Sequence, residues 1–352
     1  MNIKTKKRVT IRDIAKKTGL SIATISRVVN KTDKHYSKKT ENIVNDAIKE
    51  LNYRPNFIAW GLKKRKTNTI GFVVPELDSY YTEIFLGAQD VALKYKYSNF
   101  LCNTNYIKEL ERIYIDNLLH RQVDGVIFNT GLLNNKLIYK FLEENIPVAL
   151  IENFINNLSL EKNPLVITVA LDFYKYAKIA VEHLINNGYR RIAYISAPLE
   201  MVSLRERLRG YKDALKENGI GYDEKLVYFD KSIRGEWDLT ASGRLIENII
   251  TQLNPPDALF IISDTVAMVA IQVIKKLGMK IPDDIGVVGF DDRRFCKYLD
   301  PPLTSIYQPK YEMGAKATEM LIRIIEGEDL KDRSINMDMK LSIRESSKRL
   351  SV

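Results

Sequence analysis

The sequence predicts an α/β protein: an N-terminal three-helix helix-turn-helix domain plus a hinge helix, followed by a two-lobed, doubly wound body. Three observations predict this. Two short helices flank a glycine turn near the N-terminus, positive charge is confined to the first fifth of the chain, and strand patterns alternate with helical patterns after residue 69. At 352 residues and 45% hydrophobic, the chain is long enough for two or three domains.

Capping residues and apolar spacing predict the first two helices. Thr10 and Asp13 have the spacing of a capping box, Gly19 stands where a left-handed residue ends a helix, and Ser21 begins the next helix. The apolar face of this second helix is Ile25, Val28 and Val29. Its exposed face is Ile22, Ala23, Ser26 and Arg27. Two helices about a glycine turn are typical of a helix-turn-helix, whose second helix enters the major groove. A helical hairpin of unknown purpose is the alternative.

The distribution of charge favours a polyanionic partner. Residues 1–66 contain 18 Lys and Arg against 5 Asp and Glu, whereas the rest of the chain has 36 against 39. A small basic domain on a slightly acidic body indicates nucleic acid, because the positive charge is concentrated where a phosphate backbone would lie.

A third helix and a conditional hinge follow. The third helix is predicted from Ser37 to about Leu51, with Asn52 ending it in the left-handed conformation. Its apolar stripe is Ile43, Val44, Ala47, Ile48 and Leu51. Residues 56–62 are too few to hold a helix alone in water, so we expect a helix there only when something binds it. A solvated linker is the alternative.

Ten apolar segments after residue 69 predict two parallel sheets. The first series of strands is 70–75, 100–104, 125–130, 148–151 and 166–171. The second series is 192–197, 227–230, 258–263, 286–290 and 305–308. Ten strands exceed one comfortable sheet, so we expect two similar lobes with a ligand cleft at the carboxyl ends of their strands.

Polar and aromatic side chains follow several of these strands. They are Tyr80 and Tyr81 after the first strand, Arg205, Arg207 and Arg209 before a helix, Asp264, and the pair Asp291 and Asp292. Carboxylates accept protons from sugar hydroxyls, and a guanidinium donates to oxygens in pairs. These residues are candidate ligand contacts, although Asp264 could equally cap its helix.

Neither an enzyme, a metal nor a cofactor is indicated. No phosphate loop, dinucleotide fingerprint, zinc-protease motif or nucleophile elbow occurs, and the three histidines are scattered. Adjacent acids such as Asp291 and Asp292 point apart at a strand end, so they make a poor acid–base pair. No membrane-spanning run or signal peptide is present, and Cys102 and Cys296 are expected to be buried free thiols of the cytoplasm.

Ordered motifs along nearly the whole chain resemble the LacI/GalR family of bacterial transcription repressors. The matching segments are 10–15, 19–21, 24–30, 51–56, 70–75, 123–127, 180–184, 287–292 and 301–309. The lobes alone are also periplasmic-binding-protein-like, but such proteins lack residues 1–62. The resemblance implies a cytoplasmic homodimer that binds palindromic double-stranded operator DNA. It divides the chain into a DNA-binding domain (1–55), a hinge helix and linker (56–66) and an effector-binding and dimerisation domain (67–352).

The resemblance also implies the DNA contacts. Ile22, Ala23 and Arg27 match base-reading positions, with Arg27 able to fork onto a guanine edge. Phosphate or capping contacts are implied for Thr10, Ser21, Thr24, Ser26 and Asn30. In the hinge the implied residues are Asn56, Ala59 and Leu62, with Leu62 as a leucine wedge in the minor groove.

For the effector, Arg207 and Asp291 match the family's contacts. Further candidates are Tyr80, Tyr81, Trp237, Asp264 and Gln308, with an ordinary core aromatic as the alternative for Trp237. Arg209 replaces what is often a small residue, which suggests an added cation that selects an anionic effector such as a sugar phosphate or sugar acid.

The expected function is an effector-controlled operator-binding repressor of a carbohydrate-utilisation operon, with a sugar or sugar derivative as effector. A catabolite-control regulator that answers to a phosphorylated carrier protein is the first alternative. A sugar-modifying enzyme with a DNA-binding arm is the second.

Overall fold

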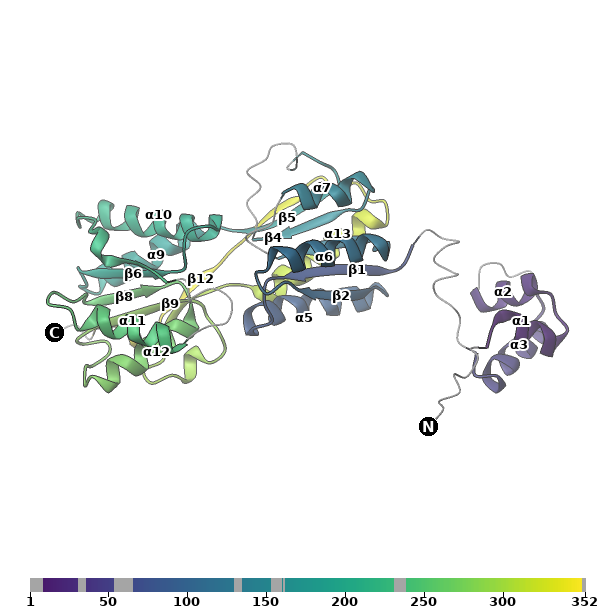
Figure 1. The fold of residues 1–352 in the computed structure, drawn as a ribbon, viewed down its shortest axis with the longest axis horizontal. Helices are drawn as coiled ribbons and strands as arrows, with labels where there is room; N and C mark the ends of the chain where they lie inside the picture. The colour runs from purple at the N-terminus through teal and green to yellow at the C-terminus, as the bar shows by residue number, and fades with distance from the viewer. Residues whose placement is uncertain are drawn as a thin grey trace. The chain divides into compact units, whose positions relative to one another are not determined.

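The computed structural model describes residues 9–30, 36–53, 66–129, 135–152, 160, 162–230 and 239–349. The chain forms two compact units, Met1–Thr67 and Asn68–Val352. In Figure 1 the first unit is purple and the second runs from blue to yellow.

The first unit is a three-helix bundle around one small core. Its helices are α1 (Ile11–Thr18), α2 (Ile22–Asn30) and α3 (Lys38–Glu50). The buried side chains at their centre are Ile14, Ile25, Val28, Val44 and Ala47. The three helices predicted from the sequence are therefore confirmed. The prediction that Ile43 belongs to the apolar stripe of this helix is wrong. Its side chain is 40% exposed, because the core is filled by the neighbouring stripe of Val44, Ala47 and Ile48.

The helix ends of this unit are formed by the residues that the sequence predicted. The Asp13 carboxylate accepts the Thr10 backbone N–H at 2.8 Å and the Thr10 hydroxyl at 2.7 Å. Gly19 has φ +68° and Asn52 has φ +48°, both in the left-handed region. The Thr24 N–H donates to Ser21 Oγ at 3.1 Å. Gly19 and Ser21 fix the turn between α1 and α2, and with it the direction in which α2 presents its exposed side chains.

The second unit consists of two lobes, each with a six-stranded sheet. Lobe 1 has the strand order β11-β5-β4-β3-β1-β2. Its strands are β1 (Thr69–Val74), β2 (Ser98–Asn103), β3 (Gly125–Phe128), β4 (Val148–Ile151), β5 (Val166–Leu171) and β11 (Ser334–Met337). Its helices are α5 (Ser79–Lys94), α6 (Lys108–His120), α7 (Asn135–Glu143) and α13 (Lys310–Ile325).

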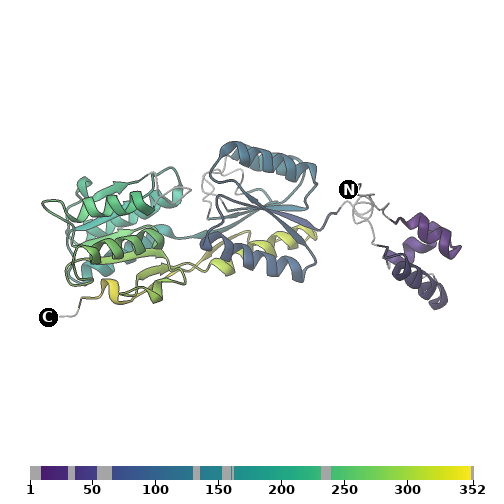
Figure 2. The ribbon, with the colours of Figure 1, turned by 60° about the horizontal axis from the view of Figure 1, so that its bottom comes forward.

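Lobe 1 has helices on both faces of its sheet. Side chains such as Ile70 and Phe72 pack toward α5 and α13, and the alternate residue Val73 packs toward α6 and α7. Figure 2 shows the sheet between these two layers. α5 and α13 approach closely, since a Cβ on Gly87 would lie 1.9 Å from the Tyr311 carbonyl oxygen and one on Gly314 would lie 1.8 Å from that of Ile84.

Lobe 2 repeats this architecture with the order β12-β10-β9-β8-β6-β7. Its strands are β6 (Ile192–Ser196), β7 (Val227–Phe229), β8 (Ala258–Ile261), β9 (Gly286–Asp291), β10 (Thr304–Tyr307) and β12 (Lys340–Ser342). Its helices are α9 (Phe173–Asn186), α10 (Val202–Glu217), α11 (Leu239–Ile250) and α12 (Asp264–Lys276). α9 lies against α10, and α11 lies against α12 (Figure 1).

All ten predicted strands are present, and the first and second series fall into separate lobes as expected. Two strands, β11 and β12, were not predicted, because these short edge strands contain no buried residue and no apolar run. The chain passes between the lobes after β5, after β10 and after β11. Residues in these crossings therefore lie beside the cleft.

The two cysteines agree with what the sequence predicts. Cys102 and Cys296 are buried free thiols. Within the part of the chain that the structure describes, no helix has the length and apolar character needed to cross a membrane.

Candidate functional site

The exposed face of α2 is a candidate DNA-reading surface. Ile22, Ala23 and Arg27 are exposed, whereas Ser26 and Thr24 are half-buried and Ile25 and Val28 face the core. Thr24 and Ser21 are joined through their hydroxyls at 2.8 Å, so both take part in the cap of α2. Thr10 is exposed and its N–H and hydroxyl are taken by Asp13.

Some predicted contacts lie outside the described residues. These are Asn56, Ala59 and Leu62 of the expected hinge, Trp237, and the side chain of Asn30.

A small cavity lies between the lobes, at the carboxyl ends of their strands. Its volume is about 90 Å³. Lobe 1 contributes Glu76, Asp78, Tyr80, Tyr81, Tyr106 and Glu152; lobe 2 contributes Ala197, Met201, Ser203, Leu204, Arg207, Ile262, Ser263, Asp291 and Arg293. Of the effector candidates, Tyr80, Tyr81, Arg207 and Asp291 are thus brought together.

Three buried polar atoms at this cavity have no hydrogen-bond partner within the described ranges: Glu152 Oε1, Arg207 Nε and Ser263 Oγ. Burying such atoms unpaired is costly, on the order of 1–3 kcal/mol each and more for charged groups. They comprise an acceptor from lobe 1, a donor from lobe 2 and a hydroxyl. A ligand that carries several hydroxyl groups would satisfy all three.

Aromatic rings hold the Arg207 guanidinium in place. Its Cζ lies 4.0 Å from the centroid of the Phe290 ring and 4.7 Å from that of Phe173, and its Nη1 donates to the Ile262 carbonyl at 3.3 Å. Stacking positions the planar group while leaving its edge for hydrogen bonds.

The three arginines do not precede a helix, as the sequence suggested, because α10 begins at Val202 and includes them all. Residues two apart on a helix point about 200° apart. Arg207 therefore faces the cavity, and Arg209 does not. The Arg209 side chain is 57% exposed, pairs with Glu206 at 2.7 Å and lies over the Tyr174 ring. Arg209 therefore does not line the cavity. It does not supply the cation that the sequence suggested for selecting an anionic effector.

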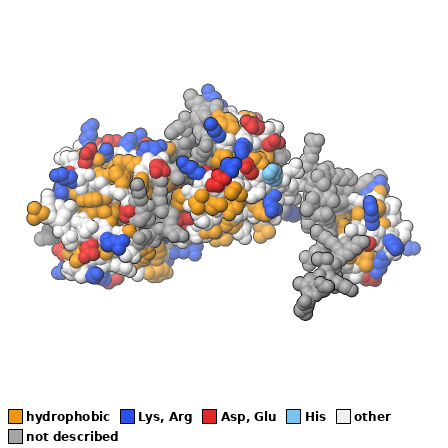
Figure 3. Space-filling view, in the orientation of Figure 1, with side chains coloured by type: hydrophobic (Ala, Val, Ile, Leu, Met, Phe, Trp, Pro, Cys, Tyr) orange, Lys and Arg blue, Asp and Glu red, His pale blue; other side chains and the backbone are white. Residues whose placement is uncertain are grey.

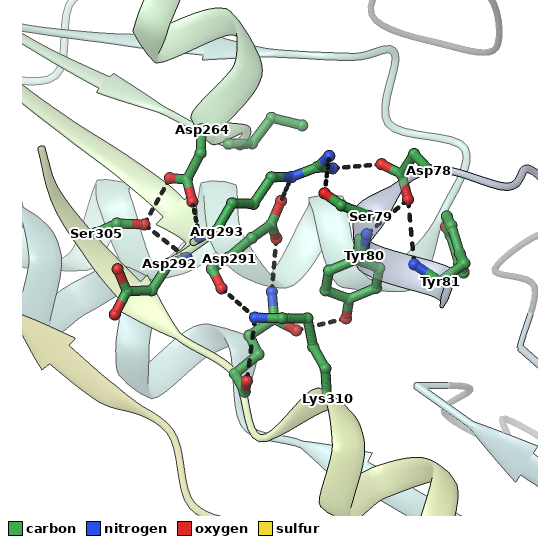
Figure 4. A network of polar contacts seen from close by, with 12 residues as sticks. Asp78, Ser79, Tyr80, Tyr81, Asp264, Asp291, Asp292, Arg293, Ser305 and Lys310 are labelled. Carbon is green, nitrogen blue, oxygen red and sulfur yellow. Dashed lines mark hydrogen bonds and ion pairs between the residues drawn. The ribbon is translucent and has the colours of Figure 1, made fainter. Parts of the chain in front are cut away.

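A chain of hydrogen bonds connects the lobes beside the cavity (Figure 4). The Tyr80 hydroxyl donates to Gln308 Oε1 at 2.7 Å, and Gln308 Nε2 donates to Asp291 Oδ1 at 2.8 Å. Lys310 Nζ donates to the Asp291 carbonyl at 2.6 Å. Gln308 is fully buried and does not line the cavity, so it acts within the described structure as a bridge between Tyr80 and Asp291. Asp291 itself has φ +115°, a conformation rare outside glycine.

Asp264 lies next to this network but does not line the cavity. Its carboxylate accepts the Ser305 hydroxyl at 2.6 Å and the Arg293 backbone N–H at 2.7 Å. It is fully buried, and burial, reinforced by the nearby Asp291, raises its pKa to about 7. Asp264 does not cap its own helix α12 either, because its carboxylate oxygens bind Ser305 and Arg293.

Burial also changes the acids that line the cavity. Desolvation raises the pKa of Glu152 to about 8, although Arg207 and Lys310 oppose the shift. Desolvation raises the pKa of Asp291 as well, against the cations Arg293, Arg207 and Lys310. A buried carboxyl whose pKa is raised by desolvation is typical of a functional polar site.

Glu152, Asp78, Ser263 and Arg293 were not among the effector candidates from the sequence. Glu152, Asp78 and Arg293 follow predicted strands, as Tyr80 and Asp291 do, whereas Ser263 is the last residue of the predicted strand 258–263. Tyr80 and Asp291 were chosen because they follow a strand. The same criterion, called here the strand-end rule, could have found Glu152, which comes directly after β4. It could not have shown that Arg293 reaches across to lobe 1.

A larger hollow of about 410 Å³ lies between α13 and the segment that follows it, lined by residues such as Lys316, Arg323 and Asp329. Their charges are used in surface ion pairs, Lys316 with Glu319, Arg323 with Glu328 and Asp329 with Arg333. No atom lining it is among the buried unpartnered ones within the described ranges. The inter-lobe cavity is therefore the better ligand site despite its smaller volume.

The fold and the sites together define a class of protein: a DNA-binding regulator whose helix-turn-helix is joined to a two-lobed ligand-binding body. Comparisons with known proteins agree. Residues 10–56 match the family described as "Bacterial regulatory proteins, lacI family", and residues 181–347 match the "Periplasmic binding protein-like domain".

Similar proteins match nearly the whole chain. The ribose operon repressor of Halalkalibacterium halodurans is 34% identical over 340 residues, which cover 96% of this chain and 97% of that protein. Catabolite control protein A of Priestia megaterium is 30% identical over 342 residues, 97% of this chain and 99% of that protein. The crystal structure of the lac repressor dimer bound to operator and the anti-inducer ONPF superposes with a TM-score of 0.84 at 26% identity, covering 97% of this chain and all of that one.

The chain belongs to the LacI family of bacterial regulatory proteins. It is a DNA-binding transcription regulator with an effector domain, and this family is not enzymatic.

Proposed function

We propose that the protein is a repressor of a carbohydrate-utilisation operon, and that a neutral sugar or sugar derivative bound between its lobes controls its operator affinity. The observation that carries this proposal is the set of unpartnered buried atoms at the cavity, Glu152 Oε1, Arg207 Nε and Ser263 Oγ. Sugar hydroxyls both donate and accept, so one polyhydroxylated ring can bind an acceptor and a donor on opposite walls. Tyr80 and Tyr81 supply apolar ring surface beside them.

The same cavity favours a small molecule over a protein co-regulator. A phosphorylated carrier protein would act on an exposed surface, whereas these polar atoms are enclosed and reachable only by a small ligand. The similarity to a ribose operon repressor and to a catabolite control protein is compatible with either kind of control.

The proposed DNA contacts are those that the family position implies, with Ile22, Ala23 and Arg27 reading bases from the exposed face of α2. We assign residues 1–55 to DNA binding, 56–66 to the hinge and 67–352 to effector binding and dimerisation. Because the proposed partner is DNA, we propose that the protein acts in the cytoplasm.

A homodimer is part of the proposal, because palindromic half-sites need two copies of α2. Apolar side chains are exposed on α5 and on the edge strand β2: Leu86, Leu93, Phe100 and Leu101. Figure 3 shows hydrophobic side chains gathered over these elements. Exposed apolar patches of this kind mark association surfaces, and the related lac repressor was crystallised as a dimer.

Two experiments test the function. Selection of bound genomic fragments by the full chain gives the operator and the neighbouring genes. Thermal shift against a panel of sugars, sugar phosphates and sugar acids gives the effector, since a ligand at 100 times its Kd stabilises by about 2.7 kcal/mol. Stabilisation by a neutral sugar that is lost in Arg207→Gln supports the proposal. Enrichment of fragments without carbohydrate genes, or stabilisation only by phosphorylated or acidic compounds, contradicts it.

A further inference from the structure

Arg293 crosses from lobe 2 to the first turn of α5 in lobe 1. Its Nη2 donates to Asp78 Oδ2 at 2.5 Å and its Nη1 to Ser79 Oγ at 3.2 Å. On its own lobe its Nε lies 3.5 Å from Asp291 Oδ2, and its backbone N–H is held by Asp264. Figure 4 shows the Arg293 guanidinium pointing toward Asp78 and Ser79.

Within the described residues, this ion pair is largely buried, unlike the other ion pair between the lobes, Arg294 with Glu83. The side chains of Arg293 and Asp78 are 9% and 17% exposed. Burial opposes the charge on Arg293, but Asp291 and Asp78 outweigh it and raise its pKa. Arg293 therefore keeps its charge at neutral pH, and salt screens such a largely buried pair weakly.

Asp78 has two roles at once. Its Oδ1 accepts the backbone N–H groups of Tyr80 and Tyr81 at 2.9 and 3.1 Å and so caps α5, while its Oδ2 faces Arg293. A cation alone would be unfavourable at a helix N-terminus, and the capping carboxylate makes the contact possible. The pair thus attaches lobe 2 to α5, the helix that packs closely on α13 through Gly87 and Gly314.

We propose that Arg293 and Asp78 form a latch that holds the two lobes closed over the cavity and positions Asp291 for the effector. A cavity of about 90 Å³ is smaller than the roughly 300–1,000 Å³ of typical ligand pockets, so the lobes must part for a ligand to enter. Parting them breaks this pair. Because Asp78 and Asp291 already neutralise Arg293, its guanidinium offers no free charge to an anionic ligand.

The test measures lobe separation in the full-length protein without effector or operator, so its failure would leave the proposed sugar response standing. Spin labels on cysteines introduced at exposed Glu143 of α7 and Lys216 of α10 report one distance between the lobes. The native cysteines are buried, which favours labelling at the introduced ones. Labelled protein is mixed with an excess of unlabelled protein, so that each dimer carries labels on one subunit only.

The variants are chosen to separate the latch from other effects. Asp78→Asn keeps a side chain that can cap α5 but removes its charge. Arg293→Gln removes the other charge. Arg294→Gln is the matched control, because the neighbouring Arg294 also reaches lobe 1, at 3.9 Å from Glu83, but is 84% exposed. Such surface pairs contribute little.

We expect Asp78→Asn and Arg293→Gln each to shift the distance distribution to longer values, the double variant to shift it no further, and Arg294→Gln to overlay the wild type. The latch is overturned if both single variants overlay the wild type. It is overturned as well if the two shifts add in the double variant, or if Arg294→Gln shifts the distribution as much as Arg293→Gln.

Discussion

Glu152 and Arg207 line the same small cavity from opposite lobes, and each keeps one buried polar atom without a hydrogen-bond partner in the described part of the chain. Glu152 follows β4 with φ +62°, and Arg207 is stacked on Phe290. Stacking on Phe290 and Phe173 thus holds the Arg207 guanidinium in place. A ligand that binds both would connect the lobes through its own hydrogen bonds, which is how binding between the lobes can change their arrangement.

Glu152→Gln should change how stability depends on pH. The pKa of Glu152 is about 8 in the folded protein against an ordinary value of 4.5, so the folded state binds the proton more tightly. This contribution is fully present below about pH 4.5 and is lost as pH rises toward 8, by up to about 1.4 kcal/mol per pH unit. Urea unfolding of both proteins from pH 5 to 8 measures the difference.

The wild type should therefore lose stability relative to Glu152→Gln as pH rises through this range. Glu144→Gln, at an exposed position nearby, serves as control and should run parallel to the wild type. If the Glu152→Gln curve is also parallel to the wild type, Glu152 does not retain its proton in the cavity.

Gly87→Ala or Gly314→Ala should destabilise the second unit, because the added methyl would meet the backbone of the facing helix at less than 2 Å. Overpacking of this kind costs typically about 1–3 kcal/mol, occasionally more. Gly243→Ala in α11 is the control, since its Cβ would meet nothing closer than 3.6 Å and alanine favours a helix. Chemical denaturation that ranks Gly243→Ala with the other two would contradict the close contact of α5 and α13.

Arg27→Ala should relax sequence preference and weaken binding to the selected operator by roughly 1–3 kcal/mol. Lys49→Ala, an exposed cation on α3, should leave the preference among operator variants unchanged. Fluorescence anisotropy on the operator and on single-base variants measures both. Undiminished and equally selective binding by Arg27→Ala would remove this residue from the base-reading set.

Leu93→Asp should weaken the dimer without unfolding the chain, because this leucine on α5 is 72% exposed. A charge in an apolar interface must be desolvated, so we expect the variant dimer to dissociate at a higher protein concentration than the wild-type dimer. Leu253→Asp, in a fully exposed position between α11 and β8, should behave as the wild type. Sedimentation velocity over a dilution series tests this, and identical profiles for all three proteins would place the interface elsewhere.

Local rules predicted much of this molecule. The capping pair Thr10 and Asp13 and the turn at Gly19 depend on neighbours three to six residues apart, so the sequence carries them directly. The strand-end rule found Tyr80 and Asp291 for the same reason. It did not separate Arg207 from Arg209, because only the start of α10 at Val202 decides which of them faces the cavity.

Contacts between distant segments were beyond such rules. The Arg293–Asp78 pair joins residues 215 positions apart, and Gln308 reaches Tyr80 across 228. Neither follows from spacing, since both depend on how the two sheets meet. The strands β11 and β12 were missed because their pairing with β5 and β10, rather than their own composition, makes them strands.

Control of DNA binding from the cavity is tested most directly by operator affinity, measured with and without the ligand that thermal shift identifies, in the wild type and in Arg207→Gln. We expect the ligand to change the affinity of the wild type for the operator. We expect Arg207→Gln to bind the operator as tightly as the ligand-free wild type and not to respond to the ligand. An operator affinity that the ligand changes equally in both proteins would contradict control from the cavity between the lobes.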